Sequence, residues 1–299
     1  MRLVVALGGN ALLKRGEPLS AEAQRRNMRA VAATLARACA PHETVIVHGN
    51  GPQVGLLALE TEAYKLAPPT PLDVLGAESQ GMIGYVVAQE LRNAVPERDV
   101  AVLITQAIVD PDDPAFHAPT KPIGPVYPLA EGEALRARGW TLAPDGEGLR
   151  RVVASPHPVD IVELPVVKRL LEAGVLVVCA GGGGVPVGRL PDLRLEGLEA
   201  VVDKDLSAAL VATRLGAERL VILTDVDGVY ADWNTPTARR IGQTTPAQLR
   251  GLRFPAGSMG PKVEAACQFV ERGRGTAAIG ALSEAEAVIA GRAGTQVRP

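Results

Sequence analysis

The 299-residue chain has few cysteines and histidines, and no apolar run approaches the ~20 residues of a membrane-spanning helix, so no membrane span is expected. Its formal net charge is only −2, without a basic cluster interleaved with aromatics, which excludes an electrostatic case for nucleic-acid binding. The three cysteines, at positions 39, 179 and 267, are odd in number and far apart. They indicate buried residues in a cytoplasmic protein rather than a disulfide framework. The four histidines show no zinc-type spacing, and no metal ligands are predicted.

Lysine is also scarce, because arginine supplies most of the positive charge, with 25 Arg against 6 Lys. Three of the lysines stand in distinctive segments: Lys204 between two aspartates, Lys262 at the end of a glycine-containing run, and Lys121 in a Pro/Gly-rich stretch. A lysine kept where arginine is usual indicates a need for a compact, mobile point charge. Transfer of a phosphoryl group is chemistry of that kind, because it depends mainly on positioning and charge neutralisation.

Short β-branched runs that end abruptly in glycine or acidic turns alternate with helical patterns. The runs cover residues 3–7, 44–47, 100–109, 175–179 and 220–223, and their continuous apolar character predicts strands covered on both faces. The first run is expected to be a buried strand, although it could pass for the start of a signal peptide. Helices are predicted over residues 20–39, 76–94, 165–172, 204–215, 262–272 and 283–290. The alternation predicts an α/β fold with a largely parallel sheet, in which ligands bind at the carboxyl ends of the strands.

Residues 111–158 differ in composition, with many prolines, several glycines and few long apolar runs. We interpret this segment as an inserted subdomain or lid, because Tyr127, Trp140 and the pair Val152-Val153 give it side chains to bury. A long disordered linker is the alternative interpretation.

Three glycine-containing turns follow predicted strands. Gly8-Gly9-Asn10 could let the backbone approach an anion, or it could form a plain tight turn. Gly49-Asn50-Gly51 starts a denser motif that continues to Gly55 and is expected to be a substrate-holding loop. The four consecutive glycines at 181–184 carry a large entropic cost, which favours a binding role over a linker. None of these turns is a Walker A loop, and none matches the dinucleotide-binding fingerprint.

Three further motifs carry charge. Asp203-Lys204-Asp205 stands at the start of a predicted helix, so it is either a cluster favoured by the helix dipole or a lysine that a carboxylate holds toward a phosphoryl group. Residues 224–230 lack the further oxygen ligands of an EF-hand, so a nucleotide-binding turn is favoured over a metal loop. Residues 257–262 lead directly into a helix, where backbone N–H groups and Lys262 can meet phosphates.

These motifs occur in a recognisable order, at residues 5–12, 48–55, 72–85, 119–125, 202–205, 223–230 and 257–262. With them, the chain resembles the carbamate kinases of the amino acid kinase superfamily from end to end. The resemblance implies a three-layer αβα sandwich with a mainly parallel sheet, and a homodimer. It also implies an N-terminal acceptor lobe (1–215) with 111–158 as a protruding subdomain, and a C-terminal nucleotide-binding lobe (216–299).

The implied reaction is reversible transfer of a phosphoryl group between ATP and carbamate, giving ADP and carbamoyl phosphate, with Mg²⁺ on the ATP phosphates. Many relatives in the superfamily carry a lysine on the first strand, just before the Gly-Gly pair, where this chain has Val5-Ala6-Leu7. The resemblance implies that Lys121, from the protruding subdomain, takes the place of that lysine.

The motifs and the resemblance together assign roles to individual residues. The catalytic residues are expected to be Lys204, Asp205, Lys262 and Lys121. Backbone N–H groups expected to hold the acceptor and the phosphoryl oxygens are those of Gly8, Gly9, Asn10, Gly49, Asn50 and Gly51. The nucleotide is expected at Gly181, Gly182, Gly183, Thr224, Asp225, Asp227, Gly228, Tyr230, Ser258, Met259 and Gly260.

Two alternatives remain at this point. One is another phosphotransferase of the superfamily, acting on a small carboxylate or phosphate, and the missing lysine of the first strand disfavours it. The other is a nucleotide-binding regulator without turnover, which the intact Lys204, Asp205 and Lys262 disfavour.

Overall fold

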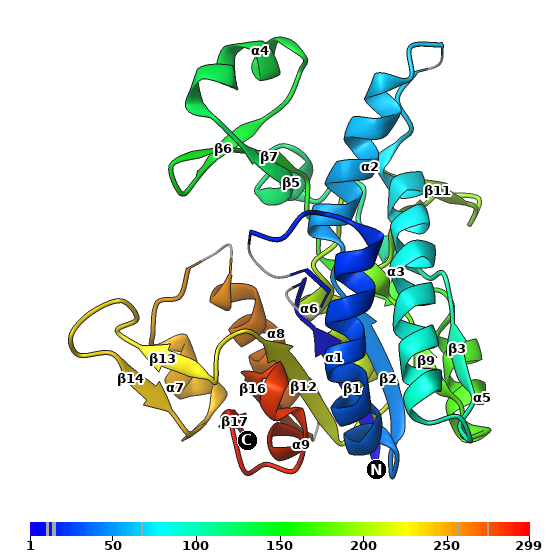
Figure 1. The fold of residues 1–299 in the computed structure, drawn as a ribbon, viewed down its shortest axis with the longest axis vertical. Coiled ribbons are helices and arrows are strands. Elements are labelled where there is room, and N and C mark those ends of the chain that lie inside the picture. The colour runs from blue at the N-terminus through cyan, green and yellow to red at the C-terminus, as the bar shows by residue number, and fades with distance from the viewer. Residues whose placement is uncertain (10–11, 14–15, 67, 256–257, 274) are drawn as a thin grey trace.

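The computed structural model describes residues 1–299 except 10–11, 14–15, 67, 256–257 and 274. Its centre is an eight-stranded sheet with the strand order β15-β17-β16-β12-β1-β2-β9-β3 (Figure 1). These strands are β1 (Arg2–Leu7), β2 (Glu43–His48), β3 (Val100–Val102), β9 (Leu176–Val178), β12 (Arg219–Thr224), β15 (Gln243–Thr244), β16 (Thr276–Ala281) and β17 (Thr295–Val297). All neighbouring strands run parallel except β16 and β17. The predicted α/β fold with a mainly parallel sheet is therefore confirmed.

Helices cover both faces of this sheet and complete the three layers. Helices α1 (Ala21–Cys39), α3 (Leu72–Ala94) and α9 (Ala285–Ile289) pack on one face, and α5 (Leu164–Glu172), α6 (Lys204–Arg214) and α8 (Met259–Arg272) pack on the other. Successive side chains of a strand point to opposite faces. Leu3, Val5 and Leu7 of β1 therefore belong to the hydrophobic core under α1, α3 and α9, and Val4 and Ala6 belong to the core under α5, α6 and α8. Burial on both faces explains why the run is apolar throughout.

In the described part of the chain, three smaller sheets flank the central one, with the strand orders β11-β10-β4-β8, β5-β7-β6 and β13-β14. Their strands are β4 (Gln106–Val109), β5 (Lys121–Tyr127), β6 (Leu142–Asp145), β7 (Gly148–Val153), β8 (Pro158–Ile161), β10 (Val185–Arg189), β11 (Leu195–Gly197), β13 (Val229–Ala231) and β14 (Arg239–Ile241). The remaining elements are α2 (Gly51–Ala63), α4 (Gly132–Ala137), α7 (Pro246–Arg250) and the 3-10 turns η2 (Pro114–Phe116), η3 (Leu129–Glu131), η4 (Gly181–Gly183) and η5 (Leu282–Glu284).

Strands β5, β6 and β7 and helix α4 form a unit that projects from the main body (Figure 1). We call residues 121–153 the protruding unit. It lies inside the segment 111–158, which therefore contains a folded sheet and a helix rather than a disordered linker.

Helix α2 occupies a segment that the sequence predicted to be a loop up to Gly55. Pro52 lies in its first turn, where a backbone N–H would have no helical partner in any case. Glycine at position 55 allows α2 to touch β5 backbone to backbone, because a Cβ built on Gly55 would lie 2.0 Å from the Cα of Gly124. Tertiary packing against the protruding unit therefore decides the structure here, and the local sequence does not reveal it.

The apolar run over residues 100–109 is divided between two sheets, since β3 belongs to the central sheet and β4 to the four-stranded one. At the break, the N–H and the hydroxyl of Thr105 donate to Oε1 of Gln80 at 3.0 and 3.2 Å. Helices α3 and α8 begin earlier than predicted, and the expected helix at 283–290 is η5 followed by α9. Helices α4 and α7 were not predicted.

Candidate active site

Two adjoining cavities open at the carboxyl ends of β1, β2 and β12. The first has a volume of about 700 Å³ and contains the turn after β2, residues 203–205 and part of the protruding unit. The second has a volume of about 460 Å³ and contains the turn after β12. Gly9, Ser258 and Lys262 line both cavities, so the two spaces meet where β1 ends.

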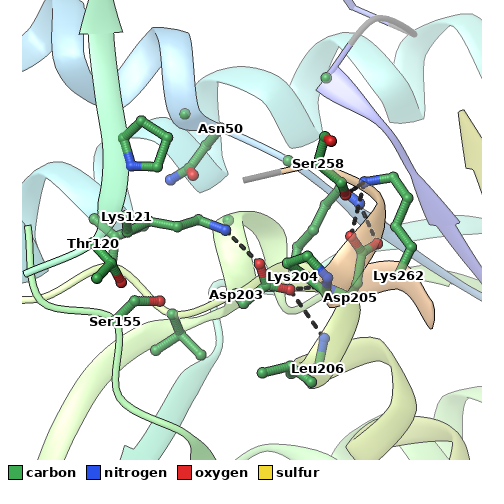
Figure 2. A pocket seen from close by; sticks show the side chains of 18 of the residues that line it. Asn50, Thr120, Lys121, Ser155, Asp203, Lys204, Asp205, Leu206, Ser258 and Lys262 are labelled. Carbon is green, nitrogen blue, oxygen red and sulfur yellow. Dashed lines mark hydrogen bonds and ion pairs between the residues drawn. The ribbon is translucent and has the colours of Figure 1, made fainter. Parts of the chain in front are cut away.

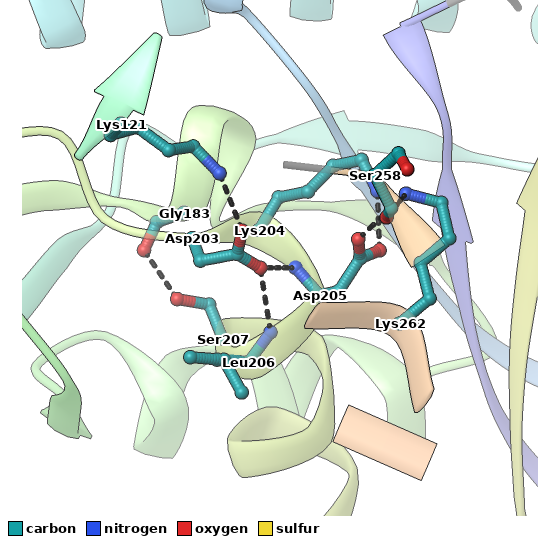
Figure 3. Close-up of polar contacts among 9 residues, drawn as sticks. All are labelled: Lys121, Gly183, Asp203, Lys204, Asp205, Leu206, Ser207, Ser258 and Lys262. Carbon is teal, nitrogen blue, oxygen red and sulfur yellow. Dashed lines mark hydrogen bonds and ion pairs between the residues drawn. The ribbon is translucent and has the colours of Figure 1, made fainter. Parts of the chain in front are cut away.

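A row of lysines and aspartates crosses the first cavity (Figure 2). Lys121, from β5, pairs with Asp203, and Lys204 pairs with Asp205. Nζ of Lys262, from α8, lies 3.2 Å from the second carboxylate oxygen of Asp205 (Figure 3). Three ammonium groups thus face two carboxylates, which leaves an excess of positive charge in this row for an anionic ligand. The structure brings all four predicted catalytic residues together.

The charges of this row depend on one another because the aspartates are buried. Burial by itself raises the pKa of Asp203, but the charge and hydrogen bond of Lys121 and the charge of Lys204 outweigh it and hold that pKa well below its usual range. Burial lowers the pKa of Lys204, Asp205 raises it, and the nearby Lys262 lowers it. An anion bound beside Lys204 would therefore stabilise its charged form.

Helices α2, α6 and α8 all begin at the first cavity. Helix N-termini attract anions, because unpaired backbone N–H groups and the helix dipole both present positive charge. Asp203 caps α6, with its Oδ1 accepting from the N–H groups of Asp205 at 2.8 Å and Leu206 at 3.2 Å. For the described helices α2 and α8, the N-cap residues Asn50 and Ser258 make no such side-chain bond. Among the described residues, therefore, neither N-cap side chain neutralises the positive end of α2 or α8.

The side chain of Asn50 is held from behind by α3 and by the glycine run. Its Nδ2 donates to Oγ of Ser79 at 2.8 Å, and that hydroxyl donates to the carbonyl of Gly76 at 2.7 Å. Gly182 lies against the amide: a Cβ built on it would come 2.2 Å from Nδ2 of Asn50, and its φ is +63°. Both facts require glycine, and Gly182 lines the first cavity.

The neighbouring glycines support the floor of the site. A Cβ on Gly181 would lie 2.4 Å from the ring of His48, and one on Gly183 would lie 2.4 Å from the carbonyl oxygen of Val202. The carbonyl of Gly183 accepts from the hydroxyl of Ser207 at 2.7 Å. We expected residues 181–183 beside the nucleotide, but none of them is among the described residues that line the second cavity. Of the three, Gly182 lines the first cavity.

Two backbone amides expected to bind substrate are already bonded within the sheet. The N–H of Gly8 donates to the carbonyl of Leu223 at 2.8 Å, and the N–H of Gly49 donates to the carbonyl of Leu7 at 3.3 Å. The N–H groups of Gly8 and Gly49 are therefore not available as donors to a ligand. The two glycines instead let the backbone come close to the ligand. The described residues of this group that line the first cavity are Gly9, Gly49, Asn50 and Gly51. Asn10 lies outside the described residues.

The second cavity gathers most of the residues predicted to bind a nucleotide, namely Thr224, Asp225, Gly228, Tyr230, Ser258 and Met259. The rings of Tyr230 and Trp233 meet edge to face at 5.1 Å, and the hydroxyl of Tyr230 donates to Oδ1 of Asp227 at 2.9 Å. Asp227 also pairs with Arg240 at 3.7 Å. Among the described residues, Asp227 orients Tyr230 instead of lining the cavity, and Gly260 lines the first cavity.

Several lining residues were not predicted. They are Thr120, Arg150, Ser155 and His157 in the first cavity, and Trp233, Arg253 and Phe254 in the second. The first group comes from the protruding unit and its connections. Thr120 lies in the 119–125 motif beside Lys121 but was assigned no role, and Arg150, Ser155 and His157 stand in no motif. Trp233 was open to prediction as a rare aromatic close to the 224–230 turn.

The described part of the chain contains no helix long and apolar enough to cross a membrane. It also holds no group of three or more His, Cys, Asp or Glu side chains arranged for a metal ion.

Comparison with known proteins agrees with this geometry. The amino acid kinase family matches residues 1–280. The chain is 51% identical over 299 residues to the carbamate kinase of Rhizobium meliloti (strain 1021), covering 99% of this chain and 92% of that protein. It is 53% identical over 295 residues to the carbamate kinase of Escherichia coli (strain K12), covering 98% of each. The solved structure of carbamate kinase from Giardia lamblia bound to AMP-PNP superposes with a TM-score of 0.89 and 38% identity, covering 99% of this chain and 98% of that one. The chain therefore belongs to the amino acid kinase family and, within it, to the carbamate kinases.

Proposed function

We propose that the protein transfers a phosphoryl group reversibly between ATP and carbamate, giving ADP and carbamoyl phosphate. In the forward step a carbamate oxygen forms a bond to the γ-phosphorus, and the bond from the γ-phosphorus to the β–γ bridging oxygen breaks, so that oxygen leaves on ADP. Carbamate is already an oxyanion, so no proton has to be removed and no general base is required.

The observation that carries the proposal is the position of the lysine row at the junction of two cavities. Lys262 lines both, and its partner Asp205 also holds Lys204. A nucleotide in the second cavity and a small oxyanion in the first would direct the transferring group at these ammonium ions. Phosphoryl transfer is accelerated mainly by fixed positive charge at the place where negative charge is redistributed.

Within this proposal each lysine has a distinct task. Lys204, oriented by Asp205, neutralises the transferring group, and Lys262 contacts the β- and γ-phosphates. Lys121, held by Asp203, contacts the acceptor or the phosphoryl group. The start of α2, at Asn50 and Gly51, offers its positive helix end to carbamate.

The nucleotide is assigned to the second cavity, where the turn after β12 and the start of α8 meet. The Giardia relative was solved with AMP-PNP, an analogue of ATP, which supports a nucleotide in this family. Mg²⁺ would bind with the nucleotide and take oxygen ligands from its phosphates, with few or no ligands from the protein.

We also propose that the protein works as a homodimer in the cytoplasm. Val74, Met82 and Tyr85 of α3 are exposed apolar side chains, which suits association better than contact with water. The mass in solution, measured by light scattering, tests this: a monomeric mass at micromolar concentration contradicts the dimer.

The decisive assay is formation of ATP from ADP and carbamoyl phosphate in the presence of Mg²⁺. It is run beside a panel of other acyl phosphates and small phosphate compounds. Formation of ATP with carbamoyl phosphate as the only active donor supports the proposal. Formation of ATP with a different donor only would mean that the acceptor of the forward reaction is the dephosphorylated form of that donor and not carbamate. Nucleotide binding without any turnover indicates a regulatory protein instead.

A further inference from the structure

A second charged cluster lies at the far end of α2, roughly 16 Å along the helix from its first turn at the cavity. Its centre is Glu62, whose side chain is 16% exposed. The carboxylate pairs with Arg138, lies 3.6 Å from Nη1 of Arg151, and accepts from Nε1 of Trp140 at 3.2 Å. Glu62 belongs to α2, whereas its three partners belong to the protruding unit.

The three partners are themselves stacked. The guanidinium carbons of Arg138 and Arg151 lie 4.6 and 4.7 Å from the centre of the Trp140 ring, and the ring of Tyr127 meets it edge to face at 5.8 Å. Two arginines placed on one aromatic ring repel each other unless an anion neutralises them. Glu62 supplies an anion in contact with both arginines, and the charge of Glu199 also acts to raise the pKa of Arg151. The contacts with Glu62 form only when the protruding unit sits on α2.

The cluster is linked to the first cavity through β7 and β5. Arg151 of β7 lies opposite Ile123 of β5, and Lys121 lies opposite Val153 in the same ladder. Ile123 is fully buried and packs with Val54 of α2. A shift of Arg151 away from Glu62 would therefore move β5, which carries Lys121.

We propose that Glu62 is a positioning residue for Lys121. By neutralising the stacked arginines, Glu62 fixes the position of the protruding unit on α2. That position determines how far the Lys121 side chain extends toward Asp203 and the transferring group. The proposal rests on the proposed function for its kinetic consequences, but not for its structural ones.

The test is a double-mutant cycle that combines Glu62→Gln with Lys121→Ala. We expect Glu62→Gln to lower kcat/KM for carbamoyl phosphate about tenfold, because small displacements of a reacting group cost this much or more. KM for ADP should stay within about twofold, since the second cavity has no residue of this cluster. In the Lys121→Ala background, Glu62→Gln should change kcat/KM by less than about twofold, because the residue that it positions is already gone.

Glu172→Gln is the matched control, because Glu172 pairs at 4.0 Å with Lys168 on the exposed surface of α5. We expect wild-type kinetics from it. Trp140→Phe removes the Nε1 donor but keeps an aromatic ring, and should lower kcat/KM in the same direction as Glu62→Gln. If the Glu62 variant does not fold, the cycle is built with Trp140→Phe.

An equal loss from Glu62→Gln with and without Lys121 overturns the proposal, because it shows a general structural effect. Hydrogen exchange of the β5 and β7 amides gives a readout that needs no substrate. Faster exchange there in Glu62→Gln than in Glu172→Gln is the expected result, and unchanged exchange refutes the proposal. A wild-type protein without carbamoyl phosphate turnover refutes the proposed function, while the exchange experiment still decides the role of Glu62.

Discussion

Replacing Gly55 by alanine adds one methyl group where α2 touches β5 backbone to backbone. The new Cβ would lie 2.0 Å from Cα and 2.1 Å from N of Gly124. Carbon atoms in contact sit ~3.5 Å apart or more, so helix and strand must separate by roughly 1.5 Å. Overpacking of this kind costs about 1–3 kcal/mol, which exceeds the gain of about 0.5–1 kcal/mol that alanine brings to a helix interior.

The same displacement reaches the first cavity, because Gly124 stands three residues from Lys121 on β5. A misplacement of about 1 Å in a reacting group can cost about a hundredfold in rate. We therefore expect Gly55→Ala to lower kcat/KM for carbamoyl phosphate by about a hundredfold, while ADP binding is unchanged.

Two assays separate the effects: thermal unfolding measures the loss of stability, and the coupled formation of ATP measures the loss of turnover. Gly81→Ala is the control, because Gly81 lies in the middle of α3 and a built Cβ there would have no atom within 4 Å apart from its chain neighbours and the backbone of its own helix. It should stabilise the protein slightly, by up to about 1 kcal/mol, with unchanged kinetics. Wild-type stability and turnover in Gly55→Ala would refute the reasoning, because β5 would then be free to yield without moving Lys121.

Lys204→Ala should lower kcat by about a hundredfold or more, since one lost charge at the transferring group costs ~3 kcal/mol of barrier; near-normal turnover with an intact circular dichroism spectrum contradicts its role. Lys121→Ala should lower kcat/KM for carbamoyl phosphate while calorimetry still detects ADP binding, and unchanged kinetics would mean that this lysine is structural. Burial is the main cause that lowers the pKa of His48 from 6.5 to about 4, so the unfolded chain takes up a proton first as the pH falls. The free energy of unfolding should therefore drop by up to about 3 kcal/mol between pH 6.5 and 4, and less so in His48→Asn, as measured by denaturant titration; equal pH slopes in both proteins count against this cause.

The central layers could be predicted because their signals are local. The run from Leu3 to Leu7 is apolar throughout, and Ser20, at the predicted start of α1, caps it by accepting from the N–H of Ala23. Lys204 and Asp205 were found for a similar reason: they stand next to each other at a helix start, so their pairing needs no knowledge of the rest of the chain.

Contacts between distant segments could not be predicted from residue patterns. Trp140 and Glu62 are 78 residues apart, and Lys121 and Asp203 are 82 apart, so each pair is created by the way the protruding unit returns to the body. The helix α2 was missed for the same physical reason, because its glycine at position 55 weakens the local helical signal and is explained only by the contact with Gly124. The family resemblance pointed to Lys121, but it gave no reason to select Glu62.

The place of β1 between β2 and β12 has a consequence for how such an enzyme can change. Leu7, the last residue of β1, lies opposite both His48 of β2 and Leu223 of β12. The turns that follow β2 and β12, which line the two cavities, therefore lie on either side of it. Hydrogen-bonded strands keep a pitch of about 4.8 Å whatever side chains they carry. The sheet thus fixes the distance between the donor and acceptor turns. Laboratory redesign can therefore exchange the loops that bind either ligand without changing the distance over which the phosphoryl group is transferred.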